Sequence, residues 1–484
     1  MDSIVSPSIF KQQFAHFFEH PLTNDQDLLV AQLEAFLKIK ENHQLFVLKG
    51  YAGTGKTSIL GAFVKTLSHF KVKTRLLAPT GRAAKVFSLK STKEAFTVHK
   101  QIYRRNSSVD EYAPMALMPN LHTNTVFIVD EASMIIGDPG FSSNQFSNTN
   151  NQLISSRNLL EDLIEYVYSG KNCRLIFLGD EGQLPPVGSD FSPALNFDYL
   201  KMNYPLLGIS TFSLTEVLRQ EKASGILKNA TLLRELTENS NLKFTTKNAP
   251  DFIRMPGVEF QDALESSLSN YGVEETLVIT RSNKRANAYN NQIRARILWF
   301  EEEVCAGDCL MVVKNNYYWI DETSKMGFIA NGESLKVIRV KKVEEQYGFQ
   351  FFRLIVKFID YDEMPEMEVL VFAESLQVEA PSISRARLKE LFFAIEQDYI
   401  HEHNKRKRFD LILKNPYFNA LQVKYAYAIT CHKSQGGQWA NVFIDQGYIE
   451  PEMISTEYFR WLYTAITRAT EKVFLINFPD ENFD

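Results

Sequence analysis

A glycine-rich loop near the N-terminus has the residue types and the spacing that bind a phosphate chain. Residues 50–57 read Gly-Tyr-Ala-Gly-Thr-Gly-Lys-Thr and fit the pattern G-x-x-x-x-G-K-[ST] in full. Glycines let backbone N–H groups turn inward around phosphate oxygens, and the N-terminus of a following helix adds partial positive charge. We expect Lys56 to reach the terminal phosphates and Thr57 to hold Mg²⁺. The expected nucleotide contacts are Gly50, Ala52, Gly53, Thr54, Gly55, Lys56, Thr57 and Ser58.

Two adjacent carboxylates complement this loop. Asp130 and Glu131 directly follow the apolar run Val126–Val129, which predicts a strand that ends in two acidic side chains. Asp130 is placed to orient the shell of a Mg²⁺ ion, and Glu131 is placed to polarise an attacking water. Carboxylates at strand ends are often only solvated caps, so this interpretation depends on the phosphate loop. Together the two segments predict a site for a nucleotide and Mg²⁺. A phosphate loop alone could also belong to a kinase, a GTPase or a transporter subunit, and the other motifs decide between these classes.

The elements that must position these groups are short apolar strands alternating with helices. Helical patterns occupy Ser58–Leu67 and Tyr458–Thr467, among others. Nearly all-apolar strands that alternate with helices indicate a parallel sheet covered on both faces. Because the runs form an early and a late group, we expect an α/β protein with two such sheets. The apolar runs are Leu45–Leu48, Arg75–Ala78, Val126–Val129, Leu175–Leu178, Leu277–Ile279, Val442–Ile444 and Val473–Ile476.

The two groups of strands predict two large domains. We expect a first lobe at 1–215, which carries the ATP site, and a second lobe at 216–484. The irregular polar stretch at about 88–122 would be an insertion in the first lobe. A stretch at about 341–414 would be an insertion in the second.

Two further expectations concern local structure. The second insertion begins with alternating strands such as Phe352–Phe358 and is expected to end in a long charged helix near Arg385–Arg408. The polar segment 142–152 has the composition of a flexible loop.

Composition narrows the class of protein. The 484 residues include 45% hydrophobic and 23% charged residues, which is ordinary for a globular chain. No apolar run approaches the roughly 20 residues that span a bilayer, and the N-terminal residues predict no secretory signal. The spacing of Cys305 and Cys309 could suggest metal ligation, but no second Cys or His pair stands beside them. We therefore expect reduced thiols and a cytoplasmic location.

The net charge of -5 argues against a histone-like polycation, although a local basic channel is enough to bind a nucleic-acid backbone. Several further segments combine polar and basic residues in a distinctive series. They are Leu22-Thr-Asn-Asp-Gln26, Leu77-Ala-Pro-Thr-Gly-Arg-Ala-Ala-Lys85, Thr97-Val-His99, Leu178-Gly-Asp-Glu-Gly-Gln-Leu-Pro-Pro186, Leu214-Thr-Glu-Val-Leu-Arg-Gln220, Tyr427-Ala-Ile-Thr-Cys-His-Lys-Ser-Gln-Gly-Gly-Gln438 and Glu457–Thr470.

This ordered series, together with the phosphate loop, resembles the superfamily 1 helicases of the RecD-like and Dda-like branch, from Leu22 to about Ile476. The resemblance implies two RecA-like lobes. It also implies that the first insertion carries the wedge that parts a duplex, and that the second insertion is SH3-like.

The resemblance implies additional nucleotide contacts. Gln26 would read adenine, because an amide both donates and accepts. Gln183 would touch the γ-phosphate side, and Arg219 and Arg468 would reach the γ-phosphate from the second lobe. Such arginines are worth about 10³–10⁵ in rate. Relatives in other branches place an aromatic residue where this chain has Leu218, so adenine stacking must come from elsewhere.

The resemblance also implies contacts to DNA, for which strand ends with hydroxyl, N–H and cationic donors are suited. Two plainer interpretations stay open, namely that Thr80 only caps a helix and that His99 is a surface histidine. Many relatives carry Glu near Gln438, so a ribose contact from that position is in doubt. The residues expected to contact DNA are Pro79, Thr80, Arg82, His99, Thr430, His432 and Lys433.

The expected activity is ATP-dependent translocation on single-stranded DNA with unwinding at duplex junctions, using ATP and Mg²⁺. Movement from 5′ to 3′, action as a monomer and a role in DNA repair or recombination follow from the resemblance alone. Three alternatives stay open. They are a translocase that removes proteins without unwinding, an RNA helicase of the same superfamily, and a nucleotide-dependent binding switch with slow turnover.

Overall fold

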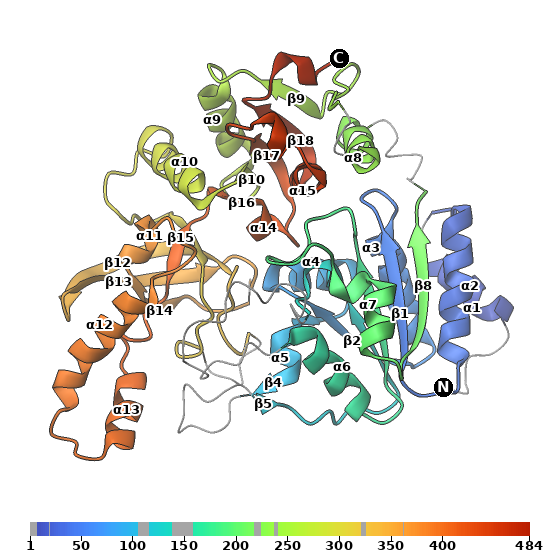
Figure 1. Ribbon diagram of the computed structural model, residues 1–484, viewed down its shortest axis with the longest axis horizontal. Coiled ribbons are helices and arrows are strands. Elements are labelled where there is room, and N and C mark those ends of the chain that lie inside the picture. The colour runs from blue at the N-terminus through green and yellow to red at the C-terminus, as the bar shows by residue number, and fades with distance from the viewer. Residues whose placement is uncertain are drawn as a thin grey trace.

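The protein is described here by a computed structural model that covers residues 7–18, 20–104, 116–137, 158–216, 224–236, 241–320, 326–361 and 363–484. Two parallel sheets and one antiparallel sheet organise this part of the chain. In Figure 1 the first parallel sheet lies at the lower right, the second at the top and the antiparallel sheet at the left. The short 3-10 helices are η1 (Ala132–Met134), η2 (Pro193–Leu195), η4 (Gln397–Tyr399), η5 (Pro451–Met453) and η6 (Asp480–Asn482).

The first sheet has six parallel strands in the order β3-β2-β6-β7-β1-β8. Its strands are β1 (Gln44–Gly50), β2 (Lys73–Ala78), β3 (Ala95–Thr97), β6 (Thr125–Val129), β7 (Arg174–Gly179) and β8 (Gly208–Leu214). The helices around it are α1 (Pro7–Phe17), α2 (Asn24–Lys38), α3 (Lys56–His69), α4 (Gly81–Ser91), α5 (Val98–Ile102), α6 (Leu159–Ser169) and α7 (Phe197–Asn203).

Strand β1 explains why this sheet is nearly all apolar. Phe46 and Leu48 pack into a core with α1, α2 and α3, whereas Leu45 and Val47 pack into a second core with α5, α6 and α7. Successive side chains of a strand point to opposite faces, so helices on both faces require apolar residues at every position. The predicted doubly covered parallel sheet is confirmed.

The second sheet has five parallel strands in the order β16-β10-β17-β18-β9. Leu277 and Ile279 face α8 and α15, while Val278 faces α9 and α10. The prediction of two RecA-like lobes is therefore confirmed. The strands are β9 (Phe252–Met255), β10 (Thr276–Thr280), β16 (Ala428–Thr430), β17 (Trp439–Asp445) and β18 (Ala469–Ile476), and the helices are α8 (Gly225–Glu235), α9 (Phe260–Tyr271), α10 (Asn283–Arg296), α14 (Cys431–Ser434) and α15 (Thr456–Ile466). The exact division at 215/216 stays a prediction, because residues 217–223 lie outside the described residues.

The third sheet is antiparallel, with the order β14-β13-β12-β11-β15. Its strands run from Cys309 to Tyr425, so it extends beyond the stretch 341–414 on both sides. The SH3-like character of this insertion stays a prediction. The elements are β11 (Cys309–Val312), β12 (Ser334–Gln346), β13 (Phe349–Phe358), β14 (Met367–Phe372), β15 (Val423–Tyr425), α11 (Glu374–Gln377), α12 (Arg385–Glu396) and α13 (Lys405–Leu413).

One local prediction in this region is wrong. The expected long helix near Arg385–Arg408 is two helices, α12 and α13, joined by the short helix η4 and a turn. Asn404 ends the connection, because its side chain accepts hydrogen bonds from the N–H groups of Arg406 and Lys407 and so caps α13. The basic start of α13 is held in ion pairs, as in Lys407–Glu402 at 2.8 Å.

The stretch 88–122 holds the end of α4, strand β3, α5 and a small hairpin of β4 (Tyr103–Arg104) and β5 (Ala116–Leu117). Strand β3 belongs to the first sheet itself. Residues 105–115, which connect the hairpin, lie outside the described part of the chain, as does the predicted loop at 142–152. The wedge therefore stays a prediction.

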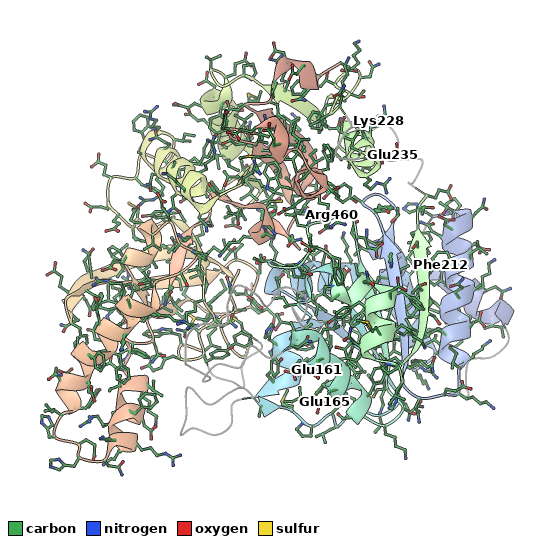
Figure 2. The ribbon with its side chains drawn as sticks, in the orientation of Figure 1. Glu161, Glu165, Phe212, Lys228, Glu235 and Arg460 are labelled. Atoms are coloured by element: carbon green, nitrogen blue, oxygen red, sulfur yellow. The ribbon has the colours of Figure 1, made fainter. Side chains whose placement is uncertain are left out.

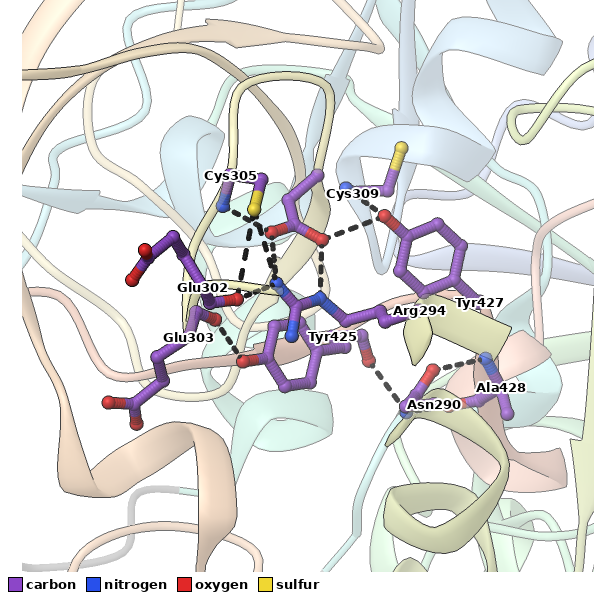
Figure 3. Close-up of polar contacts among 10 residues, drawn as sticks. Asn290, Arg294, Glu302, Glu303, Cys305, Cys309, Tyr425, Tyr427 and Ala428 are labelled. Carbon is purple, nitrogen blue, oxygen red and sulfur yellow. Dashed lines mark hydrogen bonds and ion pairs between the residues drawn. The ribbon is translucent and has the colours of Figure 1, made fainter. Parts of the chain in front are cut away.

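A buried ion pair joins the second lobe to the third sheet (Figure 3). Arg294 of α10 donates from Nε and Nη2 to the two carboxylate oxygens of Asp308, at 2.8 and 2.9 Å. Asp308 is fully buried next to β11 and also accepts from the Tyr427 hydroxyl and the N–H of Cys305. Asn290 of the same helix bonds Tyr425 of β15 and Ala428 of β16. The second lobe and the third sheet are therefore joined by a buried network of hydrogen bonds.

Candidate nucleotide site at the lobe boundary

The phosphate loop connects β1 to α3 and has the backbone that its glycines permit. Gly53 and Gly55 have φ angles of 77° and 78°, in the left-handed region that favours glycine. Gly55 is also the N-cap of α3. A Cβ at Gly50 would lie 2.9 Å from Cγ of Lys56, so glycine is required there for close packing. The loop therefore turns through two glycines and leads directly into the N-terminus of α3.

Lys56 is held above this loop by carbonyl oxygens. Its Nζ donates to the carbonyls of Gly50 and Tyr51, the latter at 2.8 Å, and lies 3.7 Å from Oδ2 of Asp180. Thr57 is half-buried and Ser58 is exposed. The ammonium group thus lies between the loop and a carboxylate of the neighbouring strand end.

Asp130 and Glu131 follow β6 at the same edge of the sheet. Burial and the nearby Glu131 carboxylate raise the pKa of Asp130 to about 6. Glu131 has a φ of 52°, which is unusual for a residue with a side chain, and its N–H donates to Oδ1 of Asp130 at 2.9 Å. The pair fits hydrated Mg²⁺, which keeps several waters and takes one or two carboxylates beside phosphate oxygens. A cation there would relieve the repulsion between the two carboxylates.

The segment after β7 contributes Asp180 and Gln183. The Asp180 side chain is 1% exposed and accepts from the N–H of Gly182 at 2.9 Å. Gln183 is buried, and its Oε1 has no hydrogen-bond partner among the described residues. A buried amide oxygen without a partner costs about 1–3 kcal/mol, so a donor such as a water is expected beside it.

Gln26 reaches the loop from α2, but its amide is already engaged. Its Nε2 donates to the carbonyl of Thr54 at 3.2 Å, and its Oε1 accepts from the N–H of Thr23 at 3.0 Å. Together with the Thr23 side chain this makes a capping box for α2. The structure therefore places Gln26, which is fully buried, beside the phosphate loop. Its reading of adenine stays a prediction.

Of the two expected arginines, Arg219 lies outside the described residues. Arg468 is 4% exposed and binds its own lobe. Its guanidinium donates to the carbonyls of Thr464 and Gly437 and to the Thr467 hydroxyl, at 3.0, 3.3 and 3.2 Å. In this arrangement Arg468 braces the end of α15, because free carbonyls at a helix C-terminus attract cations. A role at the γ-phosphate stays a proposal.

Two residues of the second lobe touch the phosphate loop, and sequence reasoning missed both. The hydroxyl of Tyr463, on α15, accepts from the N–H of Ala52 at 2.8 Å and donates to Oδ2 of Asp180 at 2.6 Å. The guanidinium of Arg234, on α8, lies 3.9 Å from the ring centroid of Tyr51. Only the position of Tyr463 within the predicted helix Tyr458–Thr467 could have pointed to it.

The two lobes also meet beside this site. The N–H of Leu184 donates to the Thr464 hydroxyl at 2.8 Å, and Gln435 Nε2 donates to the Leu184 carbonyl at 2.6 Å. Figure 2 shows Arg460 of α15 at the side of the second lobe that faces the first, where it donates to the carbonyl of Asp190 at 2.8 Å. The phosphate loop therefore lies at an interface between lobes.

Of the residues expected to contact DNA, Thr80 and Arg82 lie beside the second-lobe segment at 436–439. Thr80 accepts from the N–H of Ala83 and so caps α4, after the half-buried Pro79. Arg82 donates to the carbonyl of Gln438 at 2.9 Å and stacks 4.0 Å above the ring of Trp439. The segment at 80–82 thus contacts the segment at 430–438 across the lobe boundary.

The remaining candidates are half-buried. Burial lowers the pKa of His99, whose ring lies 6.5 Å from that of Phe328. Burial also lowers the pKa of His432, and it lowers the pKa of Lys433 to about 8. The Nζ of Lys433 has no hydrogen-bond partner within the described ranges. Thr430 is half-buried at the N-cap of α14.

The four cysteines are free thiols. Among the described residues, no group of three or more His, Cys, Asp or Glu side chains is arranged to hold a metal ion. No helix in the described part of the chain is long and apolar enough to cross a membrane.

Comparison with known proteins finds two matching domain families and several similar proteins. Residues 27–138 match the AAA domain family, and residues 425–476 match the UvrD-like helicase C-terminal domain. The ATP-dependent DNA helicase Dda of Enterobacteria phage T4 is 24% identical over 93% of this chain and 99% of its own length. Protein R530 of Acanthamoeba polyphaga mimivirus is also 24% identical, over 93% of this chain and 98% of its own length.

The fold is similar to that of the Pif1 helicase from Candida albicans, with 15% identity, a TM-score of 0.45 and 96% of each chain covered. The two domain matches and the full-length similarity to Dda agree with the phosphate loop and the two parallel-sheet lobes described above. The chain is similar to superfamily 1 helicases of the RecD-like and Dda-like branch.

Proposed function

We propose that this protein is an ATP-dependent DNA helicase that couples ATP hydrolysis between its two lobes to movement along single-stranded DNA. The observation that carries the proposal is the position of the phosphate loop, whose Ala52 N–H contacts Tyr463 of the second lobe. A nucleotide bound in that loop must change the contact between the lobes. Hydrolysis is therefore tied to relative motion of the lobes.

Each candidate residue of the nucleotide site has a distinct role in this proposal. Lys56 leaves the carbonyls that hold it and binds the terminal phosphates, while Glu131 orients the attacking water. Gln183 offers its Oε1, which has no hydrogen-bond partner among the described residues, to that water or to a group near it. Thr57 and Asp130 would hold Mg²⁺, which would neutralise charge on the phosphates. Arg219 and Arg468 would complete the site from the second lobe.

The DNA would lie over the place where the two lobes meet beside α4. Arg82 already links α4 to the backbone of Gln438, so motion between the lobes must alter the spacing of these segments. If the two lobes bind the DNA strand tightly in alternation, each cycle of hydrolysis moves the protein along the strand. The name of Dda, an ATP-dependent DNA helicase, supports DNA rather than RNA as the substrate. Movement from 5′ to 3′, a monomeric state, a cytoplasmic location and a role in repair or recombination remain proposals.

A strand-displacement assay tests the proposal. Duplexes with either a 5′ or a 3′ single-stranded tail are incubated with the protein and ATP, with a non-hydrolysable ATP analogue as the control. We expect the protein to separate the strands of the 5′-tailed duplex when ATP is present, and not when the analogue replaces ATP. Hydrolysis stimulated by single-stranded DNA without strand separation would instead indicate a translocase that removes proteins.

Measuring ATP hydrolysis with different polynucleotides separates a DNA helicase from an RNA helicase and from a binding switch. Stimulation of hydrolysis by RNA but not by DNA of the same sequence would identify an RNA helicase. A slow rate of hydrolysis that no polynucleotide alters would identify a nucleotide-dependent binding switch, and the proposal would then be wrong.

A further inference from the structure

The hydroxyl of Tyr463 occupies a position on the phosphate loop that a phosphate oxygen would take. Backbone N–H groups of such a loop are the donors that bind phosphate. The N–H of Ala52 instead donates to the Tyr463 hydroxyl at 2.8 Å, and the same hydroxyl donates to Asp180 at 2.6 Å. Burial raises the pKa of Tyr463 well above its usual value, so the hydroxyl keeps its proton and serves as both acceptor and donor.

The surroundings identify which phosphate this would be. Asp180 lies 3.7 Å from Nζ of Lys56, and the lysine of this type of loop reaches the β- and γ-phosphates. Gln183, three residues after Asp180, carries a buried Oε1 without a partner among the described residues. The Tyr463 hydroxyl therefore lies close to the residues that the proposed function assigns to the terminal phosphates of ATP.

Packing around the contact between Tyr463 and Ala52 involves residues of both lobes. A Cβ at Gly182 would lie 3.0 Å from Cε1 of Tyr463, so the absence of a side chain at Gly182 makes room for the ring. The neighbouring residue, Thr464, accepts from the N–H of Leu184 at 2.8 Å. Tyr463 itself is 2% exposed. Two successive residues of α15 thus dock on the segment that follows β7.

We propose that Tyr463 is a placeholder for the terminal phosphate, which holds α15 against the phosphate loop until ATP takes the Ala52 N–H. One N–H cannot donate fully to two acceptors, so a phosphate oxygen that accepts from Ala52 must displace the Tyr463 hydroxyl. The triphosphate therefore releases Tyr463, whereas ADP, which lacks the terminal phosphate, leaves the contact in place. Tyr463 is a positioning residue that makes the lobe boundary respond to the third phosphate. This inference rests on the proposed ATP site at 50–57.

Nucleotide binding to Tyr463→Phe tests the placeholder. The substitution keeps the buried ring and removes only the hydroxyl. Because ATP no longer competes with a hydrogen bond of ordinary strength, a non-hydrolysable ATP analogue should bind about three- to tenfold more tightly, while ADP binding should change less than about twofold. Tyr458→Phe is the matched control, since that hydroxyl on the same helix is buried and bonds Gln446 within the second lobe. It should bind both nucleotides as the unaltered protein does.

Hydrogen exchange at the Ala52 amide tests the contact without any nucleotide. The amide should exchange slowly in the unaltered protein and in Tyr458→Phe, and faster in Tyr463→Phe. Equal exchange in all three proteins would overturn the inference, as would weaker binding of the ATP analogue by Tyr463→Phe, which would mean that the hydroxyl donates to the bound phosphate.

The two readouts separate this inference from the proposed function. If no variant bound nucleotide, the proposed function would fail while exchange at Ala52 would still report the contact. If Tyr463→Phe did not fold, exchange in the unaltered protein would decide. A protected Ala52 amide in the nucleotide-free protein supports the placeholder, and an unprotected amide overturns it.

Discussion

Asp130 is a carboxyl group whose ionised form is unfavourable in the nucleotide-free protein. Its pKa of about 6, against an ordinary 3.8, means that the folded protein binds this proton more tightly than the unfolded chain does. The free energy of unfolding therefore falls as the pH rises through this interval, and the loss remains at higher pH. A carboxylate whose ionised form lowers stability, beside a phosphate loop, is a candidate for a functional role.

Asp130→Asn should make the nucleotide-free protein more stable at pH 8 by about 1–3 kcal/mol, because one pKa unit corresponds to about 1.36 kcal/mol. The same variant should lose ATP hydrolysis, because an amide orients a cation poorly. Thermal unfolding at about pH 5 and pH 8 measures the effect, since protonation of Asp130 in the unaltered protein should reduce the difference at the lower pH. A difference of the same size at both values would contradict the assignment.

Arg468→Ala should lower the free energy of unfolding by about 1.5–3 kcal/mol, because the buried guanidinium bonds two carbonyls and a hydroxyl of its own lobe. It should also reduce hydrolysis while nucleotide still binds. Denaturant unfolding is the measurement, and Arg460→Ala, another arginine of α15, is the control with an expected change below about 1 kcal/mol. Normal stability with lost turnover would show that Arg468 acts only in the cleft.

At the scale of elements, α10 is the connection between the second lobe and the third sheet. Arg294 and Asp308 are both buried there, with Tyr427 and Cys305 completing the hydrogen bonds of the carboxylate (Figure 3). The second lobe and the third sheet also share one hydrophobic core. We therefore expect these two parts to move as one body.

Asp308→Asn should lower the free energy of unfolding by about 3–5 kcal/mol, because it leaves the buried Arg294 charge uncompensated. Chemical denaturation measures this change. Lys336→Ala is the matched control, since Lys336 of β12 and Glu274 also pair across the same junction, at 3.1 Å, but both are exposed. Its loss should cost less than about 1 kcal/mol. Similar effects of the two substitutions would mean that the buried pair is not the connection.

Elements that depend on local pattern were predictable, and those that depend on docking were not. The phosphate loop and the strand before Asp130 follow from glycine spacing and apolar runs, so both were predicted. Tyr463 meets Ala52 only because the lobes dock, and no spacing in the sequence records a contact between residues 411 positions apart. The break between α12 and α13 depends on the cap at Asn404, whose signal is weaker than the surrounding helical composition.

At the scale of the molecule, the first lobe is held against the rest by scattered polar contacts. Tyr463 and Thr464 meet the first lobe at the nucleotide site, Arg82 bonds the backbone of Gln438, and Lys85 donates to the carbonyl of Ile359 beyond β13. Such contacts break and reform at small cost compared with a continuous core. The second lobe and the third sheet would therefore move together relative to the first lobe.

This motion must be driven from the phosphate loop if the protein is a motor. Lys56 is the residue whose replacement tests this requirement, because within the described part of the chain its Nζ bonds loop carbonyls and lies near Asp180. Its replacement should leave both lobes folded.

The most direct test of the account is therefore the rate of ATP hydrolysis with and without single-stranded DNA, in the unaltered protein and in Lys56→Ala. We predict that DNA stimulates hydrolysis by the unaltered protein. Lys56→Ala should lose on the order of 10² or more in rate, with an unchanged unfolding temperature. DNA-stimulated hydrolysis at the normal rate by Lys56→Ala would contradict the assignment of the ATP site and the account built on it.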